Sequence, residues 1–166
     1  MTRIGIMSDT HGTVEPKIFD FFADCDILLH AGDIGDVRVI EQLSGFKPFL
    51  AVYGNIDGQD IRVFYPEIQR FRCEDVNILM VHIGGYPGHY DRKIYPILQS
   101  EHPQLFISGH SHILKVMYDQ KLQLLHINPG AIGNVGIHHV KTAIRLNIDG
   151  RNMKNLEVLE LPRKKS

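Results

Sequence analysis

The sequence predicts an α/β protein, and three observations predict it. Short apolar runs alternate with stretches of helical periodicity over the first 57 residues. Further short apolar runs fill the rest of the chain and are separated by turns rich in glycine, proline and acidic residues. The length of 166 residues, with 43% hydrophobic and 22% charged residues, suits one globular unit with its own core. We therefore expect a single domain over residues 1–166 that contains two sheets.

The first third of the chain has the pattern of βαβ units. Apolar strands are expected at 4–7, 26–30 and 49–53. Thr13 is the expected cap of a first helix and Asp36 of a second. The apolar residues of these helices recur at helical spacing, as Ile18, Phe19 and Phe22 and then as Val39, Ile40 and Leu43. Strands joined by helices in this way form a mostly parallel sheet.

The remaining two thirds contain a larger share of strands. The pair Glu74-Asp75 is expected to join strands at 71–73 and 76–81 into a hairpin. A short helix is expected to start near Lys93 or Ile94, because Pro96 is tolerated only in a first helical turn. Further strands are expected at 105–108, 116–118, 122–127, 143–148 and 156–161, with turns at 128–130 and 149–150.

Charge and composition argue against several kinds of partner. The formal net charge is −1 with acidic and basic residues mixed, so no specific nucleic-acid patch is expected. No stretch is apolar enough to span a membrane, and the first residues lack the features of a signal peptide, so we expect a cytoplasmic protein. Cys25 and Cys73 are expected to be reduced thiols, and the basic residues 163–165 a solvated tail. The oligomeric state stays open, a homo-oligomer included.

Metal-capable side chains follow most of the expected strands. Asp9 and His11 come directly after the first strand, two residues apart, so that both can face one point. One such pair is more often an ordinary hydrogen-bonded contact than a metal site. The pattern, however, recurs at four later strand ends, and the whole set comprises Asp9, His11, Asp33, Asn55, His82, His110 and His112.

These nitrogen and oxygen ligands suit manganese, iron, zinc or nickel. Seven ligands are too many for one tetrahedral site, but they suit two divalent ions that share a bridging carboxylate and a bridging water. Two such ions carry four positive charges against the two negative charges of Asp9 and Asp33, and the surplus favours an anionic group such as phosphate. A hydroxide held between the ions could then attack phosphorus in line, so the expected substrate is a small phosphate ester.

The motifs, in order, are Asp9-x-His11, Gly32-Asp33, Gly54-Asn55-x-Asp57, His82 and Gly109-His110-x-His112. The chain resembles the calcineurin-like metallophosphoesterase superfamily in this series. It is most similar to the small YfcE-type phosphodiesterases, also through Ser8-Asp9-Thr10-His11-Gly12 and Ile127-Asn128-Pro129-Gly130. The resemblance implies a four-layer αββα sandwich of two mixed sheets flanked by helices.

The resemblance also implies a role for each of these residues. Asp9, His11, Asp33 and His112 would bind one ion, and Asp33, Asn55, His82 and His110 the other, with Asp33 as the bridge. Asp57 and Asn128 would support the ligands, although Asn128 has an alternative reading as a simple turn residue. The implied cofactor is a pair of divalent ions per chain, with Mn²⁺ favoured and Fe, Ni or Zn as alternatives.

Two departures from the family pattern bear on function. Many members have a histidine directly after the asparagine of the third motif, where this chain has Ile56. A hydrocarbon cannot donate a proton, so substrates with an acidic leaving group are expected to react best. The loop after His82 also differs, and its residues Tyr86, His89 and Tyr90 are expected to be exposed rather than to touch substrate.

Two other functions stay open. The retromer scaffold subunit is similar to these small phosphodiesterases but serves as a protein-docking platform, so a catalytically weak scaffold is the main alternative. A metal-dependent amide hydrolase would use a similar water, but such enzymes typically begin with His-x-His where this chain has Asp9-x-His11.

Overall fold

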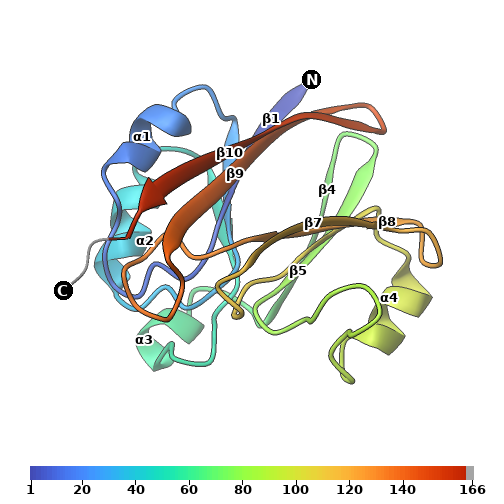
Figure 1. Ribbon diagram of the computed structural model, residues 1–166, viewed down its shortest axis with the longest axis horizontal. Helices are drawn as coiled ribbons and strands as arrows, with labels where there is room; N and C mark the ends of the chain where they lie inside the picture. The colour runs from blue at the N-terminus through green and yellow to red at the C-terminus, as the bar shows by residue number, and fades with distance from the viewer. Residues whose placement is uncertain (164–166) are drawn as a thin grey trace.

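The computed structural model describes residues 1–163, so Lys164 and Lys165 of the basic C-terminal segment lie outside the described residues. The chain forms two five-stranded sheets that face each other (Figure 1). The first sheet has the order β10-β9-β1-β2-β3. Its strands are β1 (Thr2–Met7), β2 (Ile27–His30), β3 (Phe49–Ala51), β9 (Val140–Asp149) and β10 (Asn152–Pro162). Strands β1, β2 and β3 are parallel, whereas β9 is antiparallel to both β1 and β10.

The second sheet has the order β4-β5-β6-β8-β7. Its strands are β4 (Ile68–Cys73), β5 (Val76–Val81), β6 (Leu105–Ile107), β7 (Leu114–Asp119) and β8 (Leu124–Pro129). The three middle strands are parallel, and each edge strand is antiparallel to its neighbour. Both sheets are therefore mixed, which is what the family resemblance implies.

Buried apolar side chains divide the molecule into four layers. One cluster lies between the sheets and includes Ile6 from β1, Ile78 from β5 and Ile144 from β9. A second cluster packs α1 (Lys17–Phe21), α2 (Val37–Ser44) and α3 (Gln59–Arg62) against the outer face of the first sheet. A third packs α4 (Tyr95–Glu101) against the outer face of the second sheet. The expected four-layer αββα sandwich is confirmed, with the two helical layers on opposite sides in Figure 1.

Local sequence signals explain several element boundaries, although β4, β9 and β10 begin three to four residues before the expected starts at 71, 143 and 156. Asp36 caps α2 by accepting a hydrogen bond from the backbone N–H of Arg38, as predicted. Thr13 does not cap α1, which starts only after Pro16 and has no side-chain cap. Helix α3 was not expected, because four residues are too few to show a helical period. Asn128 and Pro129 still belong to β8, so the expected turn begins only at Gly130, whose φ is +73°.

Two further expectations concern the cysteines and the tail. Cys25 and Cys73 are free, and burial raises the pKa of the Cys25 thiol to about 11. Arg163 is not a solvated tail residue, since its guanidinium donates a hydrogen bond to the backbone oxygen of His138 at 2.9 Å.

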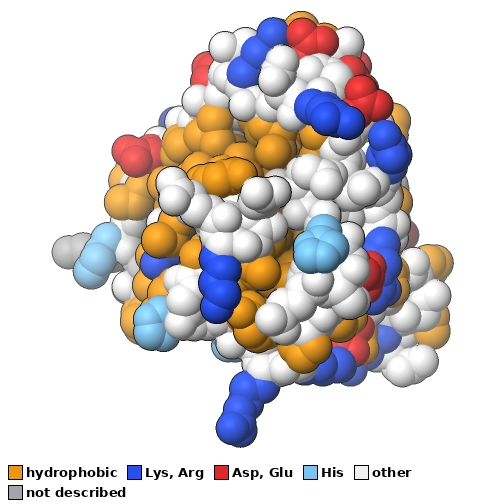
Figure 2. All heavy atoms as spheres, turned by 90° about the vertical axis from the view of Figure 1, so that its right-hand side faces the viewer, with side chains coloured by type: hydrophobic (Ala, Val, Ile, Leu, Met, Phe, Trp, Pro, Cys, Tyr) orange, Lys and Arg blue, Asp and Glu red, His pale blue; other side chains and the backbone are white. Residues whose placement is uncertain are grey.

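Within residues 1–163, no helix is long and apolar enough to cross a membrane. On the face shown in Figure 2, apolar side chains gather toward the middle, and side chains of both charges lie mainly around them.

The strand-end loops of β1 and β2 are joined by backbone hydrogen bonds that continue the ladder beyond the strands. Asp9 N–H donates to Gly32 O at 3.0 Å, His11 N–H to Asp33 O at 3.0 Å and Gly12 N–H to Ile34 O at 2.8 Å. Because parallel strands end at the same edge, these loops hold their polar side chains on one side of the sheet. That edge is where the candidate site lies.

Candidate metal centre

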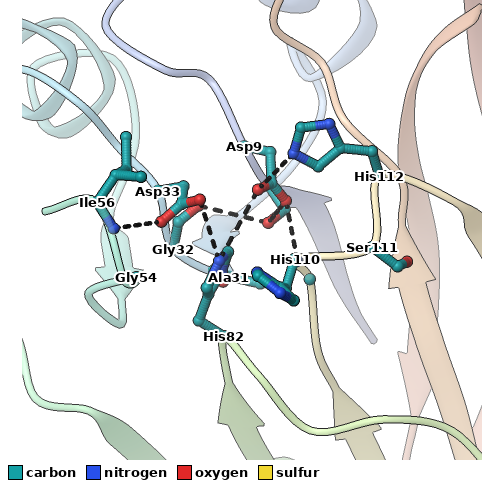
Figure 3. Close-up of polar contacts among 12 residues, drawn as sticks. Asp9, Ala31, Gly32, Asp33, Gly54, Ile56, His82, His110, Ser111 and His112 are labelled. Carbon is teal, nitrogen blue, oxygen red and sulfur yellow. Dashed lines mark hydrogen bonds and ion pairs between the residues drawn. The ribbon is translucent and has the colours of Figure 1, made fainter. Parts of the chain in front are cut away.

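The predicted ligands come from five strand ends, and six of them converge in two groups. Asp9, His11 and His112 form the first group, and Asp33, His82 and His110 form the second. Within each group, one potential ligand atom per residue lies within 4.8 Å of the others. Figure 3 shows the side chains of Asp9, Asp33, His82 and His112 pointing toward a shared centre. The structure thus brings together residues up to about a hundred positions apart, as the motif series predicts.

The first group is arranged around the carboxylate of Asp9. Its Oδ1 lies 3.1 Å from His112 Nε2, 3.7 Å from His11 Nε2 and 3.9 Å from His82 Nε2. The other oxygen, Oδ2, accepts hydrogen bonds from Ser8 Oγ at 2.6 Å and from the backbone N–H of His110 at 3.2 Å. One oxygen is therefore used to orient the carboxylate, while the other is left facing the imidazoles.

Asp33 lies between the two groups. Its Oδ2 is 3.2 Å from His82 Nε2 in the second group and 3.6 Å from His11 Nε2 in the first. Its Oδ1 accepts a hydrogen bond from the backbone N–H of Ile56 at 3.1 Å. This is the position that a carboxylate shared by two ions would occupy.

Buried atoms without hydrogen-bond partners show that this donor set fits metal ions. Asp9 Oδ1, His11 Nε2 and His82 Nε2 are all buried and make no hydrogen bond. An unsatisfied buried polar atom costs about 1–3 kcal/mol, so three at one point need a reason. Carboxylate oxygen and imidazole nitrogen are ligands of divalent transition ions, and an ion at this point would satisfy all three.

Hydrogen bonding fixes which nitrogen of His82 faces the centre. His82 Nδ1 lies 2.7 Å from the backbone oxygen of Ala31, which can only accept, so Nδ1 carries the proton. The neutral imidazole then presents the lone pair of Nε2 toward Asp33. A carbonyl that orients a histidine in this way is typical of metal ligands.

The groups of the centre shift one another's pKa values. Burial by itself would raise the pKa of Asp9, but the neighbouring imidazoles of His11 and His112 hold it well below its usual range. Burial likewise opposes ionisation of Asp33, yet His82 lowers its pKa. Asp9 raises the pKa of His11, and the two carboxylates raise that of His82 although burial opposes this. The carboxylates thus favour positive charge at this point, and a divalent ion would supply it.

The backbone of the candidate ligands is strained. Five of the seven have a left-handed conformation, in which φ lies between +49° and +72°, namely Asp9, His11, Asp33, His110 and His112. Such a conformation costs about 1–3 kcal/mol for a residue with a side chain. Strain of this kind clusters at functional sites, and here it coincides with the residues singled out for their chemistry.

The remaining predicted residues lie around the two groups. Asn55 is exposed in the loop after β3 and lines a hollow together with His82. Asp57 is buried and accepts three backbone N–H bonds, from Ile34 at 3.1 Å, Gly35 at 2.9 Å and Gly54 at 2.8 Å. It therefore ties the loop after β2 to the loop after β3. This arrangement accords with the supporting role that the resemblance implies.

Asn128 supports the loop that carries His110 and His112. Its amide nitrogen donates to Gly109 O and to Ser111 Oγ, each at 3.0 Å. Its amide oxygen accepts from Gly130 N–H at 3.0 Å, which is the contact of a turn residue. Asn128 therefore contacts both the loop that carries two candidate ligands and the turn that starts at Gly130.

A cavity of about 360 Å³ adjoins the second group. His110 forms part of its wall, together with Tyr86 and His89 from the loop after His82, and Lys115 from β7. Tyr86 and His89 are exposed, as expected, although both also line this cavity. Tyr90 instead donates a hydrogen bond to Asp119 at 2.6 Å. The sequence does not predict how Tyr86, His89 and Tyr90 differ, because the direction of each side chain depends on how the loop closes. The loop is closed by a hydrogen bond from Asp91 N–H to Gly84 O at 3.0 Å.

Ser8 and His138 belong to this site but were not identified from the sequence as candidates. Ser8 lies within the first motif and orients Asp9, so its position next to a candidate ligand was a usable signal. His138 contacts His112 from the loop between β8 and β9. Its place after the Gly-rich segment 130–136 allows it to reach the mouth of the site but does not indicate a contact with His112.

The fold and the two ligand groups together define an α/β protein with two clusters of potential metal ligands at the edge of two packed sheets. A family model described as the calcineurin-like phosphoesterase superfamily domain matches residues 2–151. The chain belongs to this superfamily, and the resemblance seen in the sequence is confirmed.

Individual relatives agree with this assignment. A probable metallophosphoesterase from Methanocaldococcus jannaschii is 30% identical, over 77% of this chain and 67% of the relative. The structure of a novel archaeal phosphodiesterase superposes with a TM-score of 0.76 and 23% identity, over 95% of this chain and 99% of that one. Vps29 from Chaetomium thermophilum superposes with a TM-score of 0.75 and 14% identity, over the whole of both chains. At these identities, the two structures show a shared fold.

Proposed function

We propose that this protein is a dinuclear metal-dependent phosphodiesterase that hydrolyses a small phosphate ester. The observation that carries the proposal is the convergence of buried, unpartnered Asp9 Oδ1, His11 Nε2 and His82 Nε2 at one point between two ligand groups. The family assignment supports a phosphoesterase, and the archaeal phosphodiesterase of the same fold supports the diester preference.

The seven candidate ligands would hold two divalent ions, with Asp33 shared between them. We favour Mn²⁺, and Fe, Ni and Zn are the alternatives for the same nitrogen and oxygen donors. When bound, the ions would supply a hydroxide nucleophile and the positive charge that stabilises a phosphoryl transition state. Asp9 and Asp33 provide only two negative charges, so a phosphate group finds a net positive site.

The protein residues around the centre would keep the ligands in place during the reaction. Ser8 and the His110 N–H fix one oxygen of Asp9, and the Ile56 N–H fixes one oxygen of Asp33. Rigid orientation of this kind avoids reorganisation in the transition state. The cavity beside His110 is large enough for the organic group of an ester.

Ile56 occupies the position at which many family members carry a histidine. Its side chain is 47% exposed beside Asp33, and it offers no proton to a departing alkoxide. General acid catalysis typically contributes two to four powers of ten, so esters with poor leaving groups should react slowly. The protein should therefore act best on diesters whose leaving group is already acidic.

Hydrolysis of bis(p-nitrophenyl) phosphate by chelator-stripped protein, with and without Mn²⁺, tests the proposal. We expect activity only with the added ion, and faster turnover of this diester than of p-nitrophenyl phosphate. Asp33→Asn serves as the control, since it should keep the fold but removes the carboxylate that we propose is shared. Faster turnover of the monoester would contradict the diester preference. No activity with any of the four metals, in protein shown to be folded, would favour the protein-docking scaffold.

A further inference from the structure

His138 lies behind His112 on the side away from Asp9. It belongs to the loop between β8 and β9 and is only 9% exposed. Its Nδ1 is 3.2 Å from His112 Nδ1, and its Nε2 is 2.9 Å from the backbone oxygen of Gly133. Among residues 1–163, the hydrogen bond between His138 and a candidate ligand is the one to His112.

The hydrogen-bond partners determine where the protons sit. The carbonyl of Gly133 can only accept, so His138 Nε2 carries a proton and, in a neutral ring, Nδ1 is an acceptor. His112 Nδ1 must then donate to it. With its proton on Nδ1, His112 presents the lone pair of Nε2 toward Asp9 Oδ1, 3.1 Å away. A metal ligand needs that lone pair.

The loop around His138 is anchored to the same centre. Gly133 N–H donates to the backbone oxygen of Asp9 at 3.1 Å, so the acceptor of His138 is fixed relative to Asp9. At the other end, Arg163 donates hydrogen bonds to the backbone oxygens of Gly136 and His138. The contacts from Asp9 through His112, His138 and Gly133 back to Asp9 form a closed ring.

Gly136 shows how closely this ring is packed. Its φ is +130°, and a Cβ atom there would lie 2.3 Å from His112 Nδ1 and 3.1 Å from His138 Nδ1. A side chain at position 136 would therefore push the two imidazoles apart, and glycine leaves room for their hydrogen bond.

We propose that His138 is a positioning residue that fixes the tautomer and orientation of His112 for the ion bound by Asp9 and His11. The inference rests on the proposed metal-dependent function and extends it to a residue that would not touch the ion. Outer partners of a ligating histidine are typically worth about 10–100-fold in metal affinity. His138 contacts a ligand of the first group. Its loss should therefore weaken the binding of one ion and leave the other ion bound.

Mn²⁺ titration calorimetry on chelator-stripped protein tests this inference without relying on activity. His138→Phe keeps an aromatic ring but removes both ring nitrogens, and we expect one of two binding events to weaken by about 10–100-fold. His138→Gln offers one donor and one acceptor and should restore much of that affinity. His139→Phe is the matched control, because this neighbouring imidazole is exposed and lies outside the ring of contacts.

The outcomes separate this inference from the proposed function. Unchanged binding of two ions by folded His138→Phe would overturn the positioning role while leaving the phosphodiesterase proposal intact. Equal weakening of the binding of both ions, or no recovery of affinity in His138→Gln, would also overturn the positioning role. Either result would indicate general damage to the site. Two ions bound by the wild type without hydrolysis would refute the phosphodiesterase, while loss of one ion in His138→Phe would still support the positioning role.

Discussion

At the scale of single residues, Asp33 and Asp57 are both buried carboxylates, but their surroundings differ. Asp33 accepts one backbone N–H and faces two imidazoles, whereas Asp57 accepts three backbone N–H groups. In Asp33→Asn the amide oxygen can keep the bond from Ile56, so the fold should survive while hydrolysis falls by more than about 100-fold. In Asp57→Asn an amide N–H would meet a backbone N–H, which should cost about 1–3 kcal/mol of stability.

Urea denaturation and diester hydrolysis, measured on the same samples, check both halves of this prediction. Asp57→Asn should lower the unfolding midpoint yet retain part of its metal-dependent activity in the fraction that is folded. Equal loss of activity in the two variants, with equal stability, would show that Asp33 is not a carboxylate shared by two ions.

At the scale of elements, the site depends on how closely the loop after β3 packs on the loop after β2. A Cβ atom on Gly54 would lie 2.1 Å from Asp33 Oδ1 and 2.3 Å from Asp33 N. Gly54→Ala should therefore displace Asp33 and reduce metal-dependent hydrolysis by about 100-fold, the cost of a misplacement near 1 Å. Gly58→Ala is the matched control, because a Cβ there meets only the side chain of Asp60, at 3.2 Å. Wild-type turnover in Gly54→Ala would refute the close packing.

The elements also show what a sequence can and cannot predict. Asp9 and Asp33 were predictable because each lies within three residues of the end of a buried strand, and parallel strands end at one edge. The position of His138 was not predictable, because it depends on contacts with Arg163, which follows β10, and with Gly136. Thr13 has the chemistry of a helix cap, but α1 begins after Pro16 instead. Long-range contacts and the closure of loops thus determine the features that local sequence patterns do not predict.

At the scale of the whole molecule, the sandwich buries two neutral histidines, one in β2 and one in β8. His30 accepts a hydrogen bond from Gly32 N–H at 3.1 Å, and His126 donates to Phe106 O at 3.2 Å. Burial lowers the pKa of each to about 4. The unfolded chain, in which histidine titrates near 6.5, therefore binds more protons between these two values. The free energy of unfolding should therefore fall as the pH drops from about 6.5 toward 4. The stability that each neutral histidine contributes is fully present only above about pH 6.5.

Replacement of His126 isolates one of these contributions. From pH 7.5 to pH 5, a histidine whose pKa falls from 6.5 to about 4 on folding should cost about 2 kcal/mol of stability. His126→Gln cannot take up the proton, so its unfolding free energy should fall by about 2 kcal/mol less than that of the wild type over the same interval. Urea denaturation in chelator at both pH values measures the difference, with His139→Gln as the control, because its side chain is exposed. Parallel pH profiles for wild type and His126→Gln would mean that His126 is protonated in the folded protein as readily as in the unfolded chain.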